Sequence, residues 1–271
     1  RFMKKIFIVF LLGLGVTFAE EGSPFFFDAI CFKSASDTLS RIDIFVLVPY
    51  GSVSFFRKSS NYVAEYELSF AVLDSLRNRV NSQNISKTIV EKEQLETLGR
   101  SAKFQQVYTK FELPEGRYTF EVTLYDKNSN ITYTKTRSTN ALNFARYQFS
   151  MSGLMFVSDI ESVNSSYKIT PYLSDNLGDL KSVFLFFEIY QRTTNLSASD
   201  FVIQVFNNKL REIYRSSRVR REIGPVSQIY LPFALPSSLA SGSYSIRVVA
   251  LKPLSNDSIF TNDEILSVAE R

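Results

Sequence analysis

The chain has 271 residues, of which 45% are hydrophobic and 21% are charged, as is typical of globular domains that bury their own cores. Its formal net charge of +4 is too small to favour a nucleic-acid partner. With one cysteine and no histidine, the chain can form no internal disulfide, Ser-His triad or imidazole metal site.

The N-terminus has the pattern of a secretory signal peptide, which we predict at residues 1–19. Lys4 and Lys5 precede an apolar stretch over residues 6–18, and small residues near its end place the cleavage before Glu20. The apolar stretch is too short to span a bilayer, and no later segment is long and apolar enough for a membrane helix. We therefore expect an exported protein that is periplasmic, attached to the outer membrane or secreted.

The first two residues, Arg1 and Phe2, precede Met3 and are interpreted as an extension of the natural start. Removal of the signal segment takes away three cations and lowers the formal net charge from +4 to +1. The mature protein is therefore nearly neutral.

Alternating residues in the first half predict β-strands. Over residues 42–48, aliphatic residues at every second position alternate with Asp43 and Phe45, the period of a half-buried strand, and the alternation is clearest over residues 62–73. Glu65 and Glu67 share the polar face of the second segment, where we interpret them as part of a solvated surface. Residues 74–84 are polar and are predicted to form a loop, with an exposed strand after it near residues 88–93.

A pattern that occurs twice gives the fold class. Each copy has Leu-Pro, then Gly-x-Tyr, then alternating apolar residues, with Gly116 and Tyr118 in the first copy and Gly242 and Tyr244 in the second. Proline interrupts a strand ladder and glycine permits a tight backbone, so each copy predicts a corner between two strands. A tyrosine after such a corner is typical of immunoglobulin-like sandwiches.

The repeat predicts an all-β chain with two tandem immunoglobulin-like or fibronectin type III-like sandwiches. Residues 138–143 are polar and lack periodicity, which places a boundary between domains at residues 24–140 and 144–271. The chain stops at Arg271 in a strand-like segment, so we expect the second domain to be truncated and the natural protein to continue.

One cluster of charged residues is a candidate binding site. Arg215, Arg218, Arg220 and Arg221 could contact an anionic partner, or they could form a solvated strand edge that resists aggregation. Residues 126–131 begin like a calcium loop but lack its glycine, so a hairpin loop is predicted there. No catalytic, cofactor-binding or metal-binding residue is predicted, and no cofactor.

Several stretches together resemble one bacterial family. The sequence RIDIFVLVPYGSVSFFR at residues 41–57, then YVAEYEL at 62–68, LPEGRY at 113–118 and FFEIY at 186–190, is similar to the N-terminal region of GWxTD domain-containing proteins. The Gly-Trp-x-Thr-Asp motif itself is absent, since the chain has no tryptophan. The resemblance implies a Gram-negative cell-envelope protein and assigns no catalytic residue.

These observations predict a non-enzymatic binding or scaffolding protein of the cell envelope, with a protein or an envelope component as its partner. Phe55 and Phe56 are candidate contacts for that partner. One alternative is an accessory region of an envelope enzyme whose catalytic domain lies beyond Arg271. Another is a periplasmic chaperone or adhesin that acts by strand addition.

Overall fold

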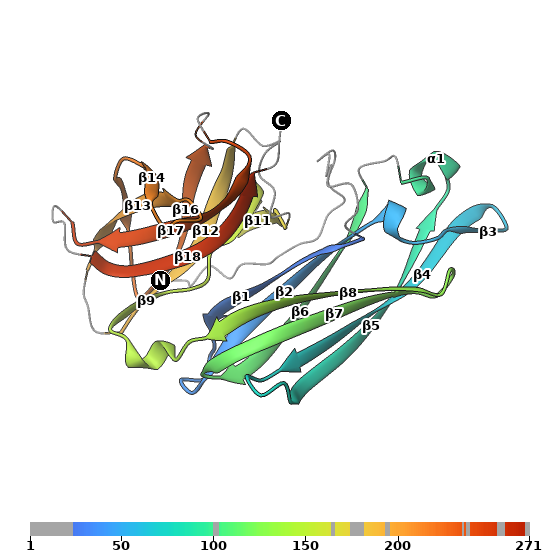
Figure 1. Cartoon of the computed structure of the whole chain (residues 1–271), viewed down its shortest axis with the longest axis horizontal. Helices are drawn as coiled ribbons and strands as arrows, with labels where there is room; N and C mark the ends of the chain where they lie inside the picture. Colours follow the sequence, from blue (N-terminus) through green and yellow to red (C-terminus); the bar gives the residue numbers. More distant parts are fainter. Residues whose placement is uncertain are drawn as a thin grey trace. The chain divides into compact units, whose positions relative to one another are not determined.

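The computed structural model is built almost entirely from antiparallel strands (Figure 1). It describes residues 24–99, 103–163, 166–173, 182–192, 196–234, 236, 239–253 and 258–268. The predicted signal peptide lies outside these residues. The described chain falls into a first unit, residues 24–29 and 41–142, and a second unit, residues 30–40 and 143–268.

The first unit is a sandwich of two sheets. Its strands and short helices are β1 (Phe26–Lys33), β2 (Leu39–Pro49), η1 (Tyr50–Ser52), β3 (Phe56–Lys58), β4 (Asn61–Leu73), β5 (Arg79–Glu91), α1 (Gln94–Thr97), β6 (Phe104–Pro114), β7 (Gly116–Asp126) and β8 (Ile131–Ala141). One sheet has the order β1-β2-β6. In the other, β4 pairs with β5 on one side and with β3 and β7 on the other, and β8 follows β7.

The alternation in β4 buries one face of that strand, as predicted. Tyr66, Leu68 and Phe70 are at most 2% exposed, while Glu65 on the other face is exposed. β2 differs from the prediction, because residues 42–48 are buried on both faces and not on one. Its Asp43 is tolerated there because its carboxylate accepts a hydrogen bond from the Tyr108 hydroxyl over 3.1 Å and forms an ion pair with Arg41 at 3.0 Å.

β5 corrects the prediction of a loop at residues 74–84. The strand begins at Arg79 and pairs with β4 along its length, from Tyr62 opposite Glu91 to Leu73 opposite Arg79. It lies at an edge of the sheet with most of its side chains exposed, so it needs no apolar alternation. The true turn is confined to residues 74–78, where the Asp74 amide donates to the Asn78 carbonyl over 2.9 Å.

The second unit is also a sandwich. Its elements are η2 (Phe144–Arg146), β9 (Phe149–Met151), β10 (Met155–Val163), β11 (Ser166–Pro171), β12 (Ser182–Gln191), β13 (Ala198–Phe206), β14 (Glu212–Arg215), β15 (Val219–Glu222), β16 (Val226–Ala234), β17 (Gly242–Leu251) and β18 (Ser258–Val268). One sheet runs β11-β10-β12-β16 with β9 on β12, and the other runs β14-β13-β17-β18 with β15 on β13. The predicted all-β class with tandem sandwiches is confirmed.

The end of the β1–β2 hairpin, Ile30–Ser40, belongs to the second unit. Phe32 packs against Phe186 of β12 with ring centroids 6.2 Å apart, and the Cys31 carbonyl accepts a hydrogen bond from the Gly153 amide over 2.7 Å. Cys31 is buried, as predicted. The predicted domain limits, residues 24–140 and 144–271, therefore differ from the units in this one segment, because its apolar side chains pack with β12.

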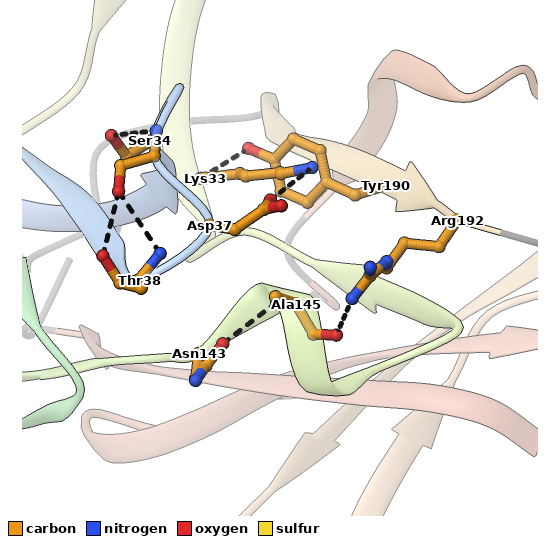
Figure 2. Close-up of polar contacts among 9 residues, drawn as sticks. Lys33, Ser34, Asp37, Thr38, Asn143, Ala145, Tyr190 and Arg192 are labelled. Atoms are coloured by element: carbon orange, nitrogen blue, oxygen red, sulfur yellow. Dashed lines mark hydrogen bonds and ion pairs between the residues drawn. The ribbon is translucent and has the colours of Figure 1, made fainter.

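Polar contacts also hold this segment (Figure 2). The Lys33 amide donates to the Tyr190 hydroxyl over 3.1 Å, and the Lys33 ammonium lies 4.0 Å from the Asp37 carboxylate. Hydroxyl groups in the turn bond one another and the turn backbone. Nearby, the Arg192 guanidinium donates to the Ala145 carbonyl. The segment is thus an integral part of the second unit.

Candidate binding surface

The two predicted corners have the same construction. The Tyr118 hydroxyl donates to the Pro114 carbonyl over 3.1 Å, and the Tyr244 hydroxyl donates to the Ala240 carbonyl over 2.8 Å. In each case the acceptor lies four residues earlier. Each corner leads the chain from one sheet to the other, from β6 to β7 and from β16 to β17.

The corner glycines lie next to the tyrosine rings, at a distance that corresponds to ordinary van der Waals contact for an added Cβ atom. A Cβ atom added to Gly116 would lie 3.4 Å from the Tyr118 ring, and one added to Gly242 would lie 3.8 Å from the Tyr244 ring. Tyr118 is buried at 8% exposure, whereas Tyr244 is only half-buried. The second ring thus enters its core less deeply than the sequence predicted, and both corners have structural roles.

The arginine cluster lies along the split edge strand formed by β14 and β15, and three of its four guanidinium groups contact a carboxylate. The Arg215 guanidinium donates to both Glu212 oxygens over 2.7 and 2.8 Å. The Arg220 guanidinium binds both oxygens of the buried Asp200 over 2.7 and 3.1 Å. The hydrogen bonds from Arg215 are the main cause that lowers the pKa of Glu212.

The other two arginines are also engaged. Arg218 lies 4.0 Å from the Asp200 carboxylate, and the Arg221 guanidinium donates to the Arg220 carbonyl over 3.0 Å. Three of the four guanidinium groups contact a carboxylate, but Glu212 and Asp200 together offset only two of the four positive charges, so the cluster keeps a formal charge of +2. The contacts fit the interpretation of a charged strand edge, and the remaining positive charge is also compatible with an anionic partner.

A broader candidate surface is the exposed face of the sheet formed by β3, β4, β5, β7 and β8, which we call the outer face. At one end of it, Phe56, Val63 and Val90 lie opposite one another on β3, β4 and β5. Phe56 is 57% exposed and Val90 is 56% exposed. The pairing register, which sequence alone does not give, therefore assembles an exposed apolar row.

Of the two aromatic residues that the sequence singled out, only Phe56 belongs to this row. The neighbouring Phe55 is half-buried, with its ring centroid 5.5 Å from that of Tyr50. Val63 was not singled out from the sequence, and Val90 was covered only by the exposed strand predicted near residues 88–93. The alternation of β4 places Val63 on the same face as Glu65, so the sequence did indicate that Val63 lies on the outer face.

Carboxylates and hydroxyls follow the apolar row on the outer face. Glu65 lies opposite Thr88, and Glu67 lies opposite Ser86, whose hydroxyl donates to it over 3.2 Å. The Lys127 ammonium lies 3.9 Å from the Glu67 carboxylate. The two glutamates thus lie on a solvated sheet face, as the sequence predicted.

The remainder of the outer face is rich in hydroxyl groups. Thr119 and Ser138 are hydrogen-bonded across β7 and β8, as are Thr123 and Thr134, each pair at 3.0 Å. Tyr125 is 36% exposed and donates to the Asn130 side chain. The outer face thus combines an apolar row with many neutral polar groups.

Asp126 organises the loop between β7 and β8. Its carboxylate accepts hydrogen bonds from the Ser54 amide, the Asn128 amide and the Ser129 hydroxyl over 2.8, 3.0 and 2.6 Å. Burial alone raises the pKa of Asp126, but these hydrogen bonds outweigh burial and lower it. The loop is a hairpin stabilised by its own donors, as predicted in preference to a calcium site.

A second polar cluster lies between η1, β5 and α1. The Lys103 ammonium is 3.3 Å from the Glu91 carboxylate and 3.4 Å from that of Glu96. Burial, together with Glu91, raises the pKa of Tyr50 to about 12. Because each charge has a partner, the cluster ties α1 to the end of the sheet.

The described residues contain neither a cluster of metal-ligating side chains nor a helix suited to a membrane. There, no three His, Cys, Asp or Glu side chains come close enough together to hold a metal ion. Within the same residues, no helix combines the length and apolar character that crossing a membrane requires.

No protein-family model matches the chain, and none of the curated proteins matches it in sequence. Among solved structures, it is similar to a DUF3823 family protein from Bacteroides ovatus, with 11% identity, a TM-score of 0.31 and coverage of 79% of this chain and 96% of that one. An adhesin from Mobiluncus mulieris has 6% identity and a TM-score of 0.25, with coverage of 91% and 98%. A β-glucuronidase from Parabacteroides merdae has 10% identity and a TM-score of 0.26, with coverage of 83% of this chain and 28% of that one. At these scores the likenesses carry no functional argument.

Proposed function

We propose that the protein is an exported, non-catalytic binding or scaffolding protein of the cell envelope, and that its first unit binds a protein or an envelope component through the outer face. The observation that carries this proposal is a row beside a polar sheet face, in which the exposed Phe56 and Val90 flank the half-buried Val63. Exposed apolar side chains that adjoin on a rigid sheet suit a partner interface. In the arginine cluster, by contrast, three of the four guanidinium groups already contact a carboxylate.

The resemblance to the N-terminal region of GWxTD domain-containing proteins supports the envelope part of the proposal. Export is tested by expressing the whole chain in a Gram-negative host and sequencing the N-terminus of the soluble product. We expect it to begin at Glu20. Recovery of soluble protein with an intact Met3 would contradict export.

Binding through the outer face is tested with purified residues 20–271 and isolated outer membranes or peptidoglycan sacculi in a sedimentation assay. We expect wild-type protein to sediment with one of them, and Phe56→Ser to weaken this several-fold. Leu76→Ser is the matched control, because Leu76 is 80% exposed in the turn after β4 of the same unit. Equal binding by both variants, or no binding by the wild type, would contradict the proposal.

A further inference from the structure

β5 is an edge strand with a long regular stretch. Among the described residues it pairs only with β4. The pairing register with β4 is continuous from residue 81 to residue 91. It shifts at Val80, because Val72 lies opposite Asn81 and the next residue, Leu73, lies opposite Arg79. Eleven residues therefore have one side of their backbone available for a further strand.

The hydrogen-bond pattern shows which groups are available. The Lys127 amide donates to the Glu65 carbonyl over 2.9 Å, so odd-numbered residues of β4 direct their backbone groups toward β7. Even-numbered residues of β4 then bond to β5, where their partners, such as Ile85 and Ile89, are odd-numbered. The even-numbered residues of β5 consequently direct their N–H and C=O groups away from the sheet.

One contact supports this assignment. The Ser82 amide, which belongs to the outward set, donates to the Asn81 side chain over 2.8 Å and not to β4. The corresponding groups of Asn84, Ser86, Thr88 and Val90 face outward in the same way.

Three other edges of the two sandwiches carry features that oppose strand addition. β8 has two inward-facing cations, Lys135 beside the Phe26 ring and Arg137 bonded to Asp28. β14 and β15 form a broken edge next to β13, and β16 contains Pro232. β5 has no proline, and between residues 81 and 90 its only charge is Lys87.

The regular stretch is compatible with pairing to itself. In an antiparallel pair centred on Ser86, all of residues 81–91 overlap, and the outward groups can form up to about ten hydrogen bonds. Lys87 then faces Ile85 of the second copy, and Glu91 faces Asn81. No like charges lie directly opposite each other, whereas a register centred on Lys87 would place two ammonium groups face to face.

We propose that β5 is a self-association edge, at which two copies of the chain pair antiparallel along residues 81–91 about a twofold axis at Ser86. We assign a second copy of the chain to this edge because, when residues 81–91 of two copies pair in this register, no like charges lie opposite each other. The two large sheets then form one continuous sheet, with an isologous interface.

The oligomeric state of residues 20–271 tests the proposal, measured by sedimentation equilibrium from about 1 to 200 µM, a range that covers weak homodimers. We expect a reversible dimer. Thr88→Pro removes one outward N–H group and no bond to β4, so it should weaken dimerisation at least tenfold while leaving the circular dichroism spectrum intact. Thr134→Pro is the matched control, because Thr134 occupies the equivalent outward position on β8.

Cross-linking tests the register independently of proline. In a Cys31→Ser background, Ser86→Cys should form a disulfide-linked dimer on mild oxidation, since the two Cα atoms would be about 5.5 Å apart. Asn84→Cys should not, because its copies would be more than about 7 Å apart. A monomer across the whole concentration range, loss of the dimer only in Thr134→Pro, or cross-linking through Asn84 in place of Ser86 would overturn the proposal.

Discussion

The Tyr118 hydroxyl is the more important of the two corner hydroxyls, because Tyr118 is 8% exposed while the Tyr244 bond is open to solvent. Tyr118→Phe leaves the Pro114 carbonyl without its donor, and we expect it to lower the free energy of unfolding by about 1–2 kcal/mol. Tyr244→Phe should cost less, about 0.5–1 kcal/mol, since water can replace the donor. Urea melts of both variants measure this, and a larger cost for Tyr244→Phe would contradict it.

Asp126 is the residue whose charge should matter most for the acid stability of the first unit. Asp126→Ala leaves the half-buried donors at Ser54, Asn128 and Ser129 without their acceptor, and we expect a loss of about 2–4 kcal/mol at pH 7. The folded pKa of Asp126 is lowered, so its stabilisation is present above the unfolded pKa of about 3.9 and is lost as the pH falls through the folded value.

The measurement for Asp126 is a set of urea melts at pH 7 and at pH 3. The difference between wild type and Asp126→Ala should shrink at pH 3. Glu65→Ala, which removes an exposed carboxylate from the outer face, is the control and should change stability by less than about 0.5 kcal/mol at both values. A difference for Asp126→Ala that does not depend on pH would contradict the assignment.

Individual side-chain roles were predictable only where the cause is local. The corner tyrosines follow from Gly-x-Tyr, because donor and acceptor are four residues apart. The pairing of Arg220 was not predictable, because its partner Asp200 lies on a neighbouring strand and depends on the register of β13 and β15. Long-range ion pairs of this kind require the topology before they can be assigned.

At the scale of elements, β4 and β5 show where pattern reasoning succeeds and fails. β4 lies inside its sheet with one face in the core, so its sequence alternates and its position was predicted. β5 lies at the edge and its residues 79–84 are exposed on both faces, so this part of its sequence shows no alternation of apolar and polar residues. The edge position that made the strand hard to predict also leaves one side of its backbone available to a partner.

The segment Ile30–Ser40 depends on a close approach at Gly153. A Cβ atom there would lie 2.9 Å from the Ile30 side chain and 3.2 Å from the Cys31 amide nitrogen. Gly153→Ala must therefore push this segment outward, and we expect a loss of about 1–3 kcal/mol in the second unit. Gly224→Ala is the control in the same unit, because its nearest neighbour, the Ser227 hydroxyl, is 3.9 Å away.

Thermal melts of the two glycine variants compare them directly. Gly153→Ala should lower the midpoint of the second unit by several degrees and leave the first unit unchanged. Equal midpoints for Gly153→Ala and Gly224→Ala would show that the backbone near Cys31 adjusts without cost.

At the scale of the whole molecule, the repeat predicted two sandwiches because each corner has a local signature. It did not predict that Ile30–Ser40 belongs with the second unit. Phe32 looks like any other apolar strand residue in the sequence, and its contact with Phe186 spans more than half of the chain. Such a contact follows from tertiary packing, so domain limits placed by linker composition miss it.

This division of the chain changes what separate fragments should do. Residues 20–142 contain every described residue of the first unit, so we expect a cooperative urea melt from that fragment. Residues 143–271 lack Ile30–Ser40 and lose the partners of Phe186, Gly153 and Tyr190. Leaving that interface unpaired removes burial of several apolar side chains at about 1.5–3 kcal/mol each, a large share of a total stability of about 5–15 kcal/mol.

We therefore expect residues 143–271 alone to unfold at a much lower urea concentration than the second unit does in the whole chain, or to lack a cooperative melt. Adding a synthetic peptide of residues 26–40 should restore stability progressively, with the logarithm of its concentration above the dissociation constant, because it binds only the folded fragment. A peptide with Phe32→Ser is the matched control and should restore less, since it lacks the ring that meets Phe186. If residues 143–271 melt at the midpoint of the second unit in the intact protein, the segment Ile30–Ser40 contributes nothing to the stability of that unit.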